Sequence, residues 1–309
     1  MSKTIALFSG QGSQYLGMGK EFYDSFDSAK KIFAAADFAL GYRLEEIIFS
    51  EDAEKLNQTV YSQPAIMACS LCAYKALEEK GVVFEGVAGH SLGEYAAIAA
   101  SGMLSLEDSF VLIKIRAEAM QKAVESNKKG SMAAIIGPNA EEIEEACSKA
   151  SGYVTAVNYN SPVQTVVAGD ESAVDEACRI ITETSTAKRV KCVKLNVASA
   201  FHCEYMQGAA DEFLQKSGDF KFSSPDKLFF SNVIGAELTD FSDMPQLFAR
   251  HIVSPVRFTS ELADIEAHGF DKYIECGPGK TLTGLVKKTL KSADAKNCED
   301  LASLEKALI

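Results

Sequence analysis

The first eighty residues pass from a short apolar run to a long stretch with helical spacing of the apolar positions. Residues 4–8 form a mostly apolar run that leads into a glycine-rich turn at residues 9–14, which is typical of a buried strand followed by a loop. From residue 20 to about residue 80 the apolar positions recur with helical periodicity. Pro64 is expected in the first turn of the last helix of this stretch, and Gly81 lies just past its end.

A second strand is followed by a sharp turn and an alanine-rich helix. Residues 86–95 pass from a short buried strand through this turn into the helix, which is expected to end near Gly102. Ser105, with Asp108 three residues later, has the pattern of a capping box, which satisfies free backbone N–H groups at the start of a helix. This pattern predicts a long helix over residues 106–126.

The pattern of apolar positions changes after residue 130, where short strands alternate with helices. Strands are expected at residues 132–136, 153–159, 164–168 and 188–195, and helices at residues 139–150 and 171–184. This β-α-β-β-α-β order is the order of a ferredoxin-like subdomain. Residues 127–130 bound the subdomain on one side and residues 196–197 on the other.

Mixed helix and strand patterns return after the subdomain, including strand-like runs at residues 227–233 and 271–276. We therefore predict an α/β protein in which residues 1–129 and 196–309 form the core and residues 130–195 form the inserted subdomain. A length of 309 residues fits two folding units, since about 150 residues per domain is usual.

Composition narrows the class of protein. A chain with 47% hydrophobic and 24% charged residues is globular rather than disordered. The net charge of −12 disfavours nucleic acid as a partner, because phosphate binding needs concentrated positive charge. The longest weakly polar stretch, residues 95–106, is shorter than the ~20 residues that cross a bilayer, and the N-terminus lacks the pattern of a secretory signal. We expect a cytoplasmic protein without a membrane partner.

Eight cysteines are scattered along the chain, which is typical of free and mostly buried thiols. Cys69 and Cys72 form a C-x-x-C pair inside a predicted helix, but no second pair completes a zinc site. Their expected role is packing in the core.

The pattern G-x-S-x-G of the nucleophile elbow occurs at residues 89–93, which read Gly-His-Ser-Leu-Gly. In this motif a serine lies on a tight turn between a strand and a helix, and glycines allow the backbone to approach closely. The strand predicted before the motif and the helix predicted after it favour this interpretation over an incidental turn. Ser91 is therefore the candidate nucleophile.

A serine nucleophile needs a general base, and the sequence contains four histidines. His90 precedes Ser91 directly and is expected to point away from its Oγ. His268 lies at a predicted helix end, where a solvated cation is the simpler role. His202 lies where the chain re-enters the core after the subdomain, and it is the best candidate base by elimination. A histidine buried in the core without a catalytic role would have the same sequence signature.

Arg116 lies on the predicted helix over residues 106–126, on the same face as Leu112, Ala119 and Met120. A buried guanidinium is costly unless an anion meets it. Two alternatives stay open from the residues alone. One is an internal ion pair with an aspartate or glutamate, and the other is a bidentate clamp for a substrate carboxylate, which suits the arginine fork.

Taken together, these residues resemble the malonyl-CoA:acyl carrier protein transacylases of type II fatty acid synthesis and, more broadly, the acyltransferase domains of polyketide synthases. The resemblance covers nearly the whole chain. Besides Arg116, it is carried by residues 7–14 (LFSGQGSQ), 89–94 (GHSLGE), 132–137 (MAAIIG), 158–162 (NYNSP), 200–202 (AFH), 254–258 (SPVRF) and 275–279 (ECGPG). The family implies an α/β-hydrolase-like core with a ferredoxin-like insertion, in agreement with the order of elements predicted above.

The resemblance also implies roles for single residues. Ser91 is the implied nucleophile and His202 its base, and the backbone N–H groups of Gln11 and Leu92 form the implied oxyanion hole. These four positions match the family's motifs directly.

Three further residues follow from the same resemblance. Arg116 is the implied clamp for the malonyl carboxylate, and Asn160 is expected near the substrate. His251 departs from the pattern, because the family commonly has a glutamine there whose backbone carbonyl orients the catalytic histidine. The carbonyl of His251 keeps this implied role, and the function of its side chain is left open.

The implied reaction is ping-pong transfer of malonyl from malonyl-CoA to the phosphopantetheine thiol of acyl carrier protein, through a malonyl ester on Ser91 and without a metal or other cofactor. An acyltransferase serving a polyketide synthase is an alternative within the family. Outside it, a serine esterase or thioesterase would share the elbow, and a non-catalytic module that binds carrier protein is a third hypothesis.

Acyl carrier proteins are typically acidic, so docking on a chain of net charge −12 requires local clusters of cations. Lysine and arginine residues within 188–194 and within 280–291 are the candidate clusters, although each fits a solvated basic face equally well. A monomer is the expected state.

Overall fold

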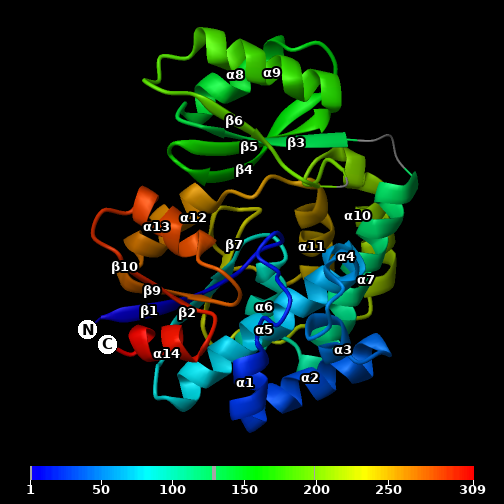
Figure 1. Cartoon of the computed structure of the whole chain (residues 1–309), viewed down its shortest axis with the longest axis vertical. Helices are drawn as coiled ribbons and strands as arrows, with labels where there is room; N and C mark the ends of the chain where they lie inside the picture. Colours follow the sequence, from blue (N-terminus) through cyan, green and yellow to red (C-terminus); the bar gives the residue numbers. More distant parts are fainter. Residues whose placement is uncertain (1, 127–129, 198) are drawn as a thin grey trace.

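The structure, a computed structural model, describes residues 2–126, 130–197 and 199–309. Within these residues, five parallel strands and one short antiparallel edge strand form the main sheet (Figure 1). In spatial order they are β10 (Asp294–Cys298), β9 (Phe270–Cys276), β1 (Lys3–Phe8), β2 (Gly86–Gly89), β7 (Leu228–Ser231) and the antiparallel β8 (Ala236–Glu237).

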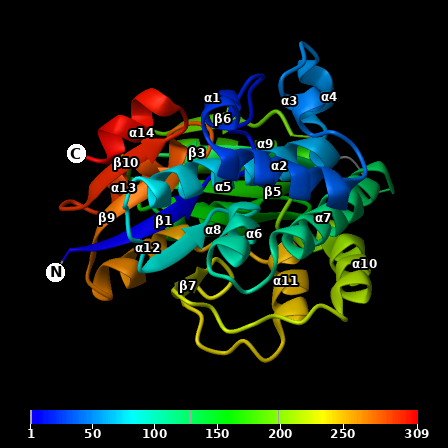
Figure 2. The same ribbon diagram turned by 90° about the horizontal axis from the view of Figure 1, so that it is seen from below.

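Alternate residues of β1 face opposite sides of this sheet. Ala6 and Phe8 pack into a large core with α1 (Lys20–Ser25), α2 (Asp27–Leu40), α3 (Glu45–Ile48), α4 (Ala53–Asn57), α5 (Thr59–Glu79), α6 (Gly93–Ala100), α7 (Leu106–Ser126), α10 (Gln207–Ser217), α11 (Met244–Val253) and α14 (Leu301–Ala307). Ile5 and Leu7 pack on the other side against α12 (Phe258–Ala267) and α13 (Thr281–Thr289). Because both faces are buried, the strand is a continuous apolar run, and helices flank the sheet on both sides (Figure 2).

A separate antiparallel sheet lies above the main sheet in the view of Figure 1. Its strands, in spatial order, are β4 (Val154–Ser161), β5 (Gln164–Asp170), β3 (Gly130–Ile136) and β6 (Lys191–Lys194). Helices α8 (Ala140–Lys149) and α9 (Glu171–Thr184) cover one of its faces. The predicted β-α-β-β-α-β order is found, with the last strand shorter than expected. Residues 127–129, at the expected boundary, lie outside the described part of the chain.

The other face of the antiparallel sheet joins the large core. Met132, Val157 and Val166 belong to the same buried cluster as the helices of the main unit. A parallel bridge also connects β4 to the segment before α12, where the N–H of Tyr159 donates to the carbonyl of Val256 at 2.9 Å. The antiparallel sheet is therefore connected to the main unit through this bridge to the segment before α12 as well as through side-chain packing.

Pro64 corrects one expectation of the sequence analysis. Helix α5 begins at Thr59, so Pro64 lies inside the helix rather than in its first turn. A proline there removes the N–H that would bond the carbonyl of Val60. The Tyr42 hydroxyl donates to that carbonyl at 3.4 Å, so the carbonyl keeps a partner.

Among the described residues, no helix has the length and apolar character that a bilayer crossing requires. A short 3-10 turn at Glu204–Met206 connects the re-entry of the chain to α10.

Candidate active site

Loops that follow three neighbouring parallel strands meet at one edge of the main sheet. β1 leads to Gln11, β2 to Ser91 and β7 to Asn232. The carboxyl ends of parallel strands share one edge, and ligands of open α/β sheets bind there. The candidate catalytic residues therefore lie at this edge of the sheet.

The turn at Ser91 is a nucleophile elbow in shape as well as in sequence. Ser91 has a φ of 53°, in the left-handed region that residues other than glycine rarely adopt. Gly89 lies against the backbone of Gly93, and Gly93 lies against the carbonyl of Phe8, so a Cβ at either glycine would collide with main chain. Both glycines are needed for the close approach that the sequence analysis expected.

Ser91 and His202 lie within hydrogen-bond distance, although 111 positions separate them in the sequence. The distance from Ser91 Oγ to His202 Nε2 is 2.7 Å. On the other side of the ring, His202 Nδ1 lies 3.2 Å from the carbonyl oxygens of both His251 and Ser254. Carbonyl oxygens only accept, so Nδ1 carries the proton and Nε2 is free to accept from the serine hydroxyl.

The surroundings of His202 keep its imidazole neutral. Burial, the positive charge of Arg116 and the neighbouring His90 lower the pKa of His202 to about 3. A neutral ring is the form that takes a proton from Ser91. His202 itself has a φ of 59°, so both members of the pair have left-handed backbone.

Arg116 on α7 reaches the same hydroxyl. Its side chain is 1% exposed, its Nη2 donates to Ser91 Oγ at 3.1 Å, and its Nη1 donates to Gln63 Oε1 at 2.7 Å. The guanidinium also lies over the ring of Tyr95, at 5.2 Å from the centroid. No carboxylate in the described part of the chain forms a salt bridge with Arg116, so the internal ion pair is not found there.

Leu92 lies within the elbow, and Gln11 lies in the loop that follows β1. No described residue accepts a hydrogen bond from the backbone N–H of either one. The loop that carries Gln11 touches the elbow, since a Cβ on Gly10 would lie 2.8 Å from the carbonyl oxygen of His90. The Gln11 side chain lies 3.5 Å from Gln63 Nε2, which places it beside the partner of Arg116.

Two predicted residues lie around the pair without touching Ser91 Oγ. Asn160 on β4 is 7% exposed, and its Oδ1 lies 2.8 Å from His90 Nε2, which directs the His90 ring away from the hydroxyl. His251 is buried on α11, and its side chain contacts Glu94 and Asn232 in addition to the contact of its carbonyl with His202.

Sequence reasoning missed four buried polar residues around the site, namely Gln63, Glu94, Asn232 and Glu261. Of these, Asn232 directly follows β7, where a polar residue at the carboxyl end of a strand was a usable signal. Glu94 ends the motif at residues 89–94, although the motif gave no role for its side chain, and Gln63 and Glu261 lie inside helices where no local pattern marks them.

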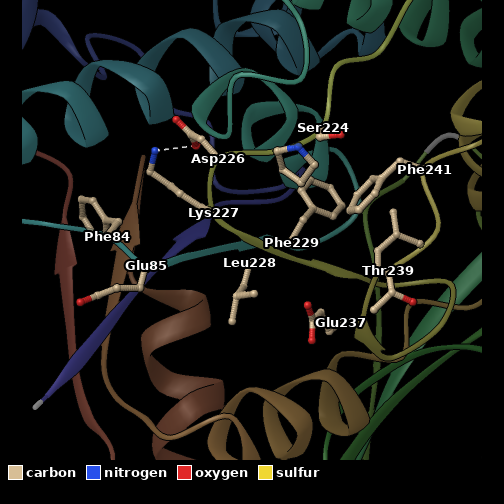
Figure 3. A pocket seen from close by; sticks show the side chains of 12 residues that line it. Phe84, Glu85, Ser224, Asp226, Lys227, Leu228, Phe229, Glu237, Thr239 and Phe241 are labelled. Atoms are coloured by element: carbon tan, nitrogen blue, oxygen red, sulfur yellow. Dashed lines mark hydrogen bonds and ion pairs between the residues drawn. The ribbon is translucent and has the colours of Figure 1, made fainter.

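One surface cavity lies away from this site. Its lining includes Glu85, just before β2, and Lys227, just before β7, together with Phe84, Phe229 and Phe241 (Figure 3). Glu85 and Lys227 lie at the amino ends of β2 and β7, opposite the edge that carries Ser91. None of the predicted site residues lines this cavity.

Comparison with known proteins decides the family. Residues 6–308 match the acyl transferase domain family. Malonyl CoA-acyl carrier protein transacylase of Bacillus subtilis is 36% identical over 311 residues, covering 100% of this chain and 97% of that protein. This chain belongs to the transacylase family.

Solved structures of the transacylase family have the same fold as this chain. The enzyme from Streptococcus pneumoniae, at 41% identity, superposes with a TM-score of 0.93 and covers 99% of both chains. A malonyl-transacylase in complex with its type II polyketide synthase acyl carrier protein, at 34% identity, also gives a TM-score of 0.93 over 99% of both chains. The mixed α/β fold with a parallel sheet and a separate antiparallel sheet is thus the fold of this family.

The low pKa of His202 gives a testable pH dependence. Because the neutral imidazole persists well below pH 6, the rate at which phenylmethanesulfonyl fluoride modifies Ser91 should change by less than about twofold between pH 5 and pH 7.5. A histidine with its ordinary pKa would lose most of its neutral form over this range. Intact mass measured against time gives the rate, and His202→Ala should remain unmodified. A titration midpoint between pH 6 and pH 7 would contradict the prediction.

Proposed function

We propose that this chain is a malonyl-CoA:acyl carrier protein S-malonyltransferase that acts through a malonyl ester on Ser91. The observation that carries the proposal is the convergence on one hydroxyl of a neutral histidine and a buried arginine without a carboxylate partner among the described residues. The histidine supports nucleophilic attack, and the arginine supports the choice of an acyl group that ends in a carboxylate.

In the first half of the reaction, His202 Nε2 takes the proton as Ser91 Oγ attacks the thioester carbon of malonyl-CoA. The N–H groups of Gln11 and Leu92 stabilise the oxyanion that develops on the carbonyl oxygen. The C–S bond then breaks, and His202 returns the proton to the departing sulfur of coenzyme A. Malonyl remains as an ester on Ser91.

The second half runs in reverse with a new thiol. The phosphopantetheine thiol of acyl carrier protein gives its proton to His202 and attacks the ester carbonyl, and the bond to Ser91 Oγ breaks. His202 returns the proton to the serine, which restores the free enzyme. The carbonyls of His251 and Ser254 hold the proton of Nδ1 in place throughout, so the ring alternates between neutral and charged forms with its orientation fixed. These steps draw only on protein groups and the two substrates.

Arg116 supplies selectivity between acyl groups. Its fork accommodates the two oxygens of the malonyl carboxylate, with Gln63 holding the other end of the guanidinium. An acetyl group would leave the buried charge without an anion, which costs roughly 2–5 kcal/mol by comparison with broken charge pairs. Asn160 lies next to His90 at the margin of the site and is proposed to contact the substrate.

The hydrolase alternative is less well supported. A serine esterase or thioesterase usually has an acidic residue against the second nitrogen of its histidine, whereas here two backbone carbonyls occupy that place. Hydrolysis also has no need for a buried arginine beside the nucleophile. An acyltransferase of a polyketide synthase would use the same chemistry, and a structural relative is a malonyl-transacylase of that kind.

The finer organisation is part of the same proposal. Residues 1–129 and 196–309 are proposed as an α/β-hydrolase-like core and residues 130–195 as a ferredoxin-like subdomain, as the strand order β4-β5-β3-β6 supports. The protein is proposed to serve fatty acid synthesis as a monomer in the cytoplasm. The free thiol state of all eight cysteines supports a reducing compartment.

Two exposed clusters are proposed to attract the acidic carrier protein. The insertion patch consists of Lys188, Arg189 and Lys191, and the C-terminal patch consists of Lys280, Lys287, Lys288 and Lys291. Lys194, which the sequence analysis counted with the first cluster, forms ion pairs with Glu171 and Asp175, so much of its charge is compensated.

A mass measurement tests the central step. Incubation with malonyl-CoA should add one malonyl group to the protein, and the adduct should persist until acyl carrier protein with its phosphopantetheine arm is added. Ser91→Ala should gain no mass. Loss of the adduct in water within the time of one transfer would support hydrolysis instead, and no adduct at all would contradict acylation.

Arg116→Ala should relax acyl selectivity. We expect the ratio of kcat/KM for malonyl-CoA over acetyl-CoA to fall by at least about tenfold, because the carboxylate loses its charged partner. Arg250→Ala, which removes an arginine on α11 outside the site, is the matched control. An unchanged ratio in Arg116→Ala would show that the clamp lies elsewhere.

Charge reversal distinguishes the two patches. Replacing the three residues of the insertion patch by glutamate, or three of the C-terminal patch in a second variant, should raise the KM for carrier protein in the variant whose patch docks it. The KM for malonyl-CoA should stay the same in both variants. If the KM for carrier protein is unchanged in both, neither patch is the docking surface.

A further inference from the structure

Asn232 ties together the backbone of the elbow. Its Oδ1 accepts from the N–H of Ser91 at 2.7 Å, and its Nδ2 donates to the carbonyl of Gly89 at 2.7 Å. The same Nδ2 donates to Glu261 Oε2 at 2.7 Å, and the backbone N–H of Asn232 donates to Glu94 Oε2 at 3.2 Å. The orientation of the amide follows from its partners, because an N–H only donates and a carbonyl only accepts. One side chain thus holds two backbone groups of the turn, the carbonyl of Gly89 where it begins and the N–H of the left-handed Ser91 at its centre.

His251 reaches the same cluster with its side chain. Its Nε2 lies 3.1 Å from Glu94 Oε2 and 3.3 Å from Asn232 Oδ1. Each of these oxygens already accepts a backbone N–H, from Asn232 and from Ser91 respectively. Asn232 Oδ1 is an amide oxygen and can only accept, so Nε2 carries the proton and donates to it, with Glu94 Oε2 also within reach. Nδ1 has no partner in the described part of the chain, which fits a bare nitrogen in a neutral ring.

The charges around His251 agree with this form. Burial, together with His202, Arg116 and His90, holds the pKa of His251 well below its usual range. Burial also raises the pKa values of the two nearby carboxyl groups, to about 8 for Glu94 and well above the usual range for Glu261.

His251 therefore touches both members of the catalytic pair by different atoms. Its carbonyl oxygen lies 3.2 Å from His202 Nδ1, and its side chain lies against the two groups that hold the backbone of Ser91. The contact is notable because the chain departs from its family at this residue, as the sequence analysis found.

We propose that the side chains of His251 and Asn232 are positioning residues for acyl transfer: His251 donates through Nε2 to fix Asn232 and Glu94, and Asn232 fixes the elbow in its left-handed form. The inference rests on the proposed function only in naming the step that it serves. Neither side chain touches the reacting atoms. Their effect is on the orientation of Ser91 and of the N–H of Leu92 that follows it.

Two substitutions at His251 separate the side chain from the carbonyl. His251→Leu and His251→Gln both keep the carbonyl, but only glutamine keeps an N–H donor for Glu94 and Asn232. We expect His251→Leu to slow malonylation of Ser91 by about tenfold or more with less than a twofold change in the KM for malonyl-CoA, since misplaced groups reduce the rate rather than binding. His251→Gln should restore most of the rate. His268→Leu, at the C-terminal end of α12, is the control for loss of a histidine.

The outcomes are distinct from those that test the proposed function. If the wild-type protein forms no malonyl adduct, the proposed function fails. If the wild-type protein is malonylated and His251→Leu reacts at the same rate, the positioning inference is overturned. A thermal melt of each variant shows whether the leucine variant is folded, and rates are taken below its melting temperature.

A second measurement reports on the wild-type protein, and it uses the conservative variant His251→Gln only to assign the signal. Nitrogen chemical shifts of the wild-type protein labelled with ¹⁵N-histidine at pH 7 should show a neutral His251 ring with the proton on Nε2, assigned by the signal that His251→Gln removes. His202 should show the opposite tautomer, with the proton on Nδ1. A charged His251 ring, or one protonated on Nδ1 alone, would refute the proposed donation.

Discussion

The reaction depends on the 2.7 Å contact between Ser91 Oγ and His202 Nε2, and the surrounding structure holds both residues in the backbone conformations that this contact requires. Both residues have left-handed backbone, with φ values of 53° and 59°, although neither is a glycine. Such conformations cost on the order of 1–3 kcal/mol each and persist only where surrounding contacts determine them. Close packing of Gly89 and Gly93 supplies those contacts for Ser91 on one side, and Asn232 supplies them on the other. For His202, the two carbonyl oxygens that face Nδ1 supply them.

Burial of one positive charge explains the electrostatics of the site. Arg116 is nearly inaccessible to solvent, and its polar partners are the neutral groups of Gln63 and Ser91. Its charge helps keep His202 neutral, because a second positive charge nearby is unfavourable. A substrate that brings a carboxylate would compensate this charge. The buried guanidinium of Arg116 thus has two effects. It favours the neutral form of His202, which can accept a proton, and it favours an acyl group that ends in a carboxylate.

The parts of the site that the sequence predicted are those with a local signature. The elbow is read from five consecutive residues, and Arg116 is conspicuous because a charge interrupts an apolar helix face. Elimination among the four histidines leaves His202 as the candidate base, but it does not predict how close His202 lies to Ser91. The main elements of the fold follow from periodicity in the same way, including the β-α-β-β-α-β order along residues 130–195.

The parts that the sequence could not predict depend on contacts between distant segments. Asn232 bonds Ser91 across 141 positions and Glu261 across 29, and no spacing rule connects them. The position of Pro64 was wrong for a related reason. The rule that places proline in the first helical turn assumes that the freed carbonyl has no other partner, whereas Tyr42 provides one from outside the helix. Tertiary contacts of this kind override local preference without leaving a trace in the pattern of apolar residues.

A short stretch of chain from His251 to Glu261 connects the two sheets to the catalytic pair. Two of its carbonyls face His202, Val256 bridges to β4, and the ring of Phe258 lies edge-on to His90 at 5.5 Å. Glu261 closes the stretch by accepting from Asn232. β4 also carries Asn160, whose Oδ1 lies 2.8 Å from His90 Nε2, so the antiparallel sheet reaches the site through this residue as well. The antiparallel sheet is therefore in contact both with the segment whose carbonyls face His202 and with the residue that precedes Ser91.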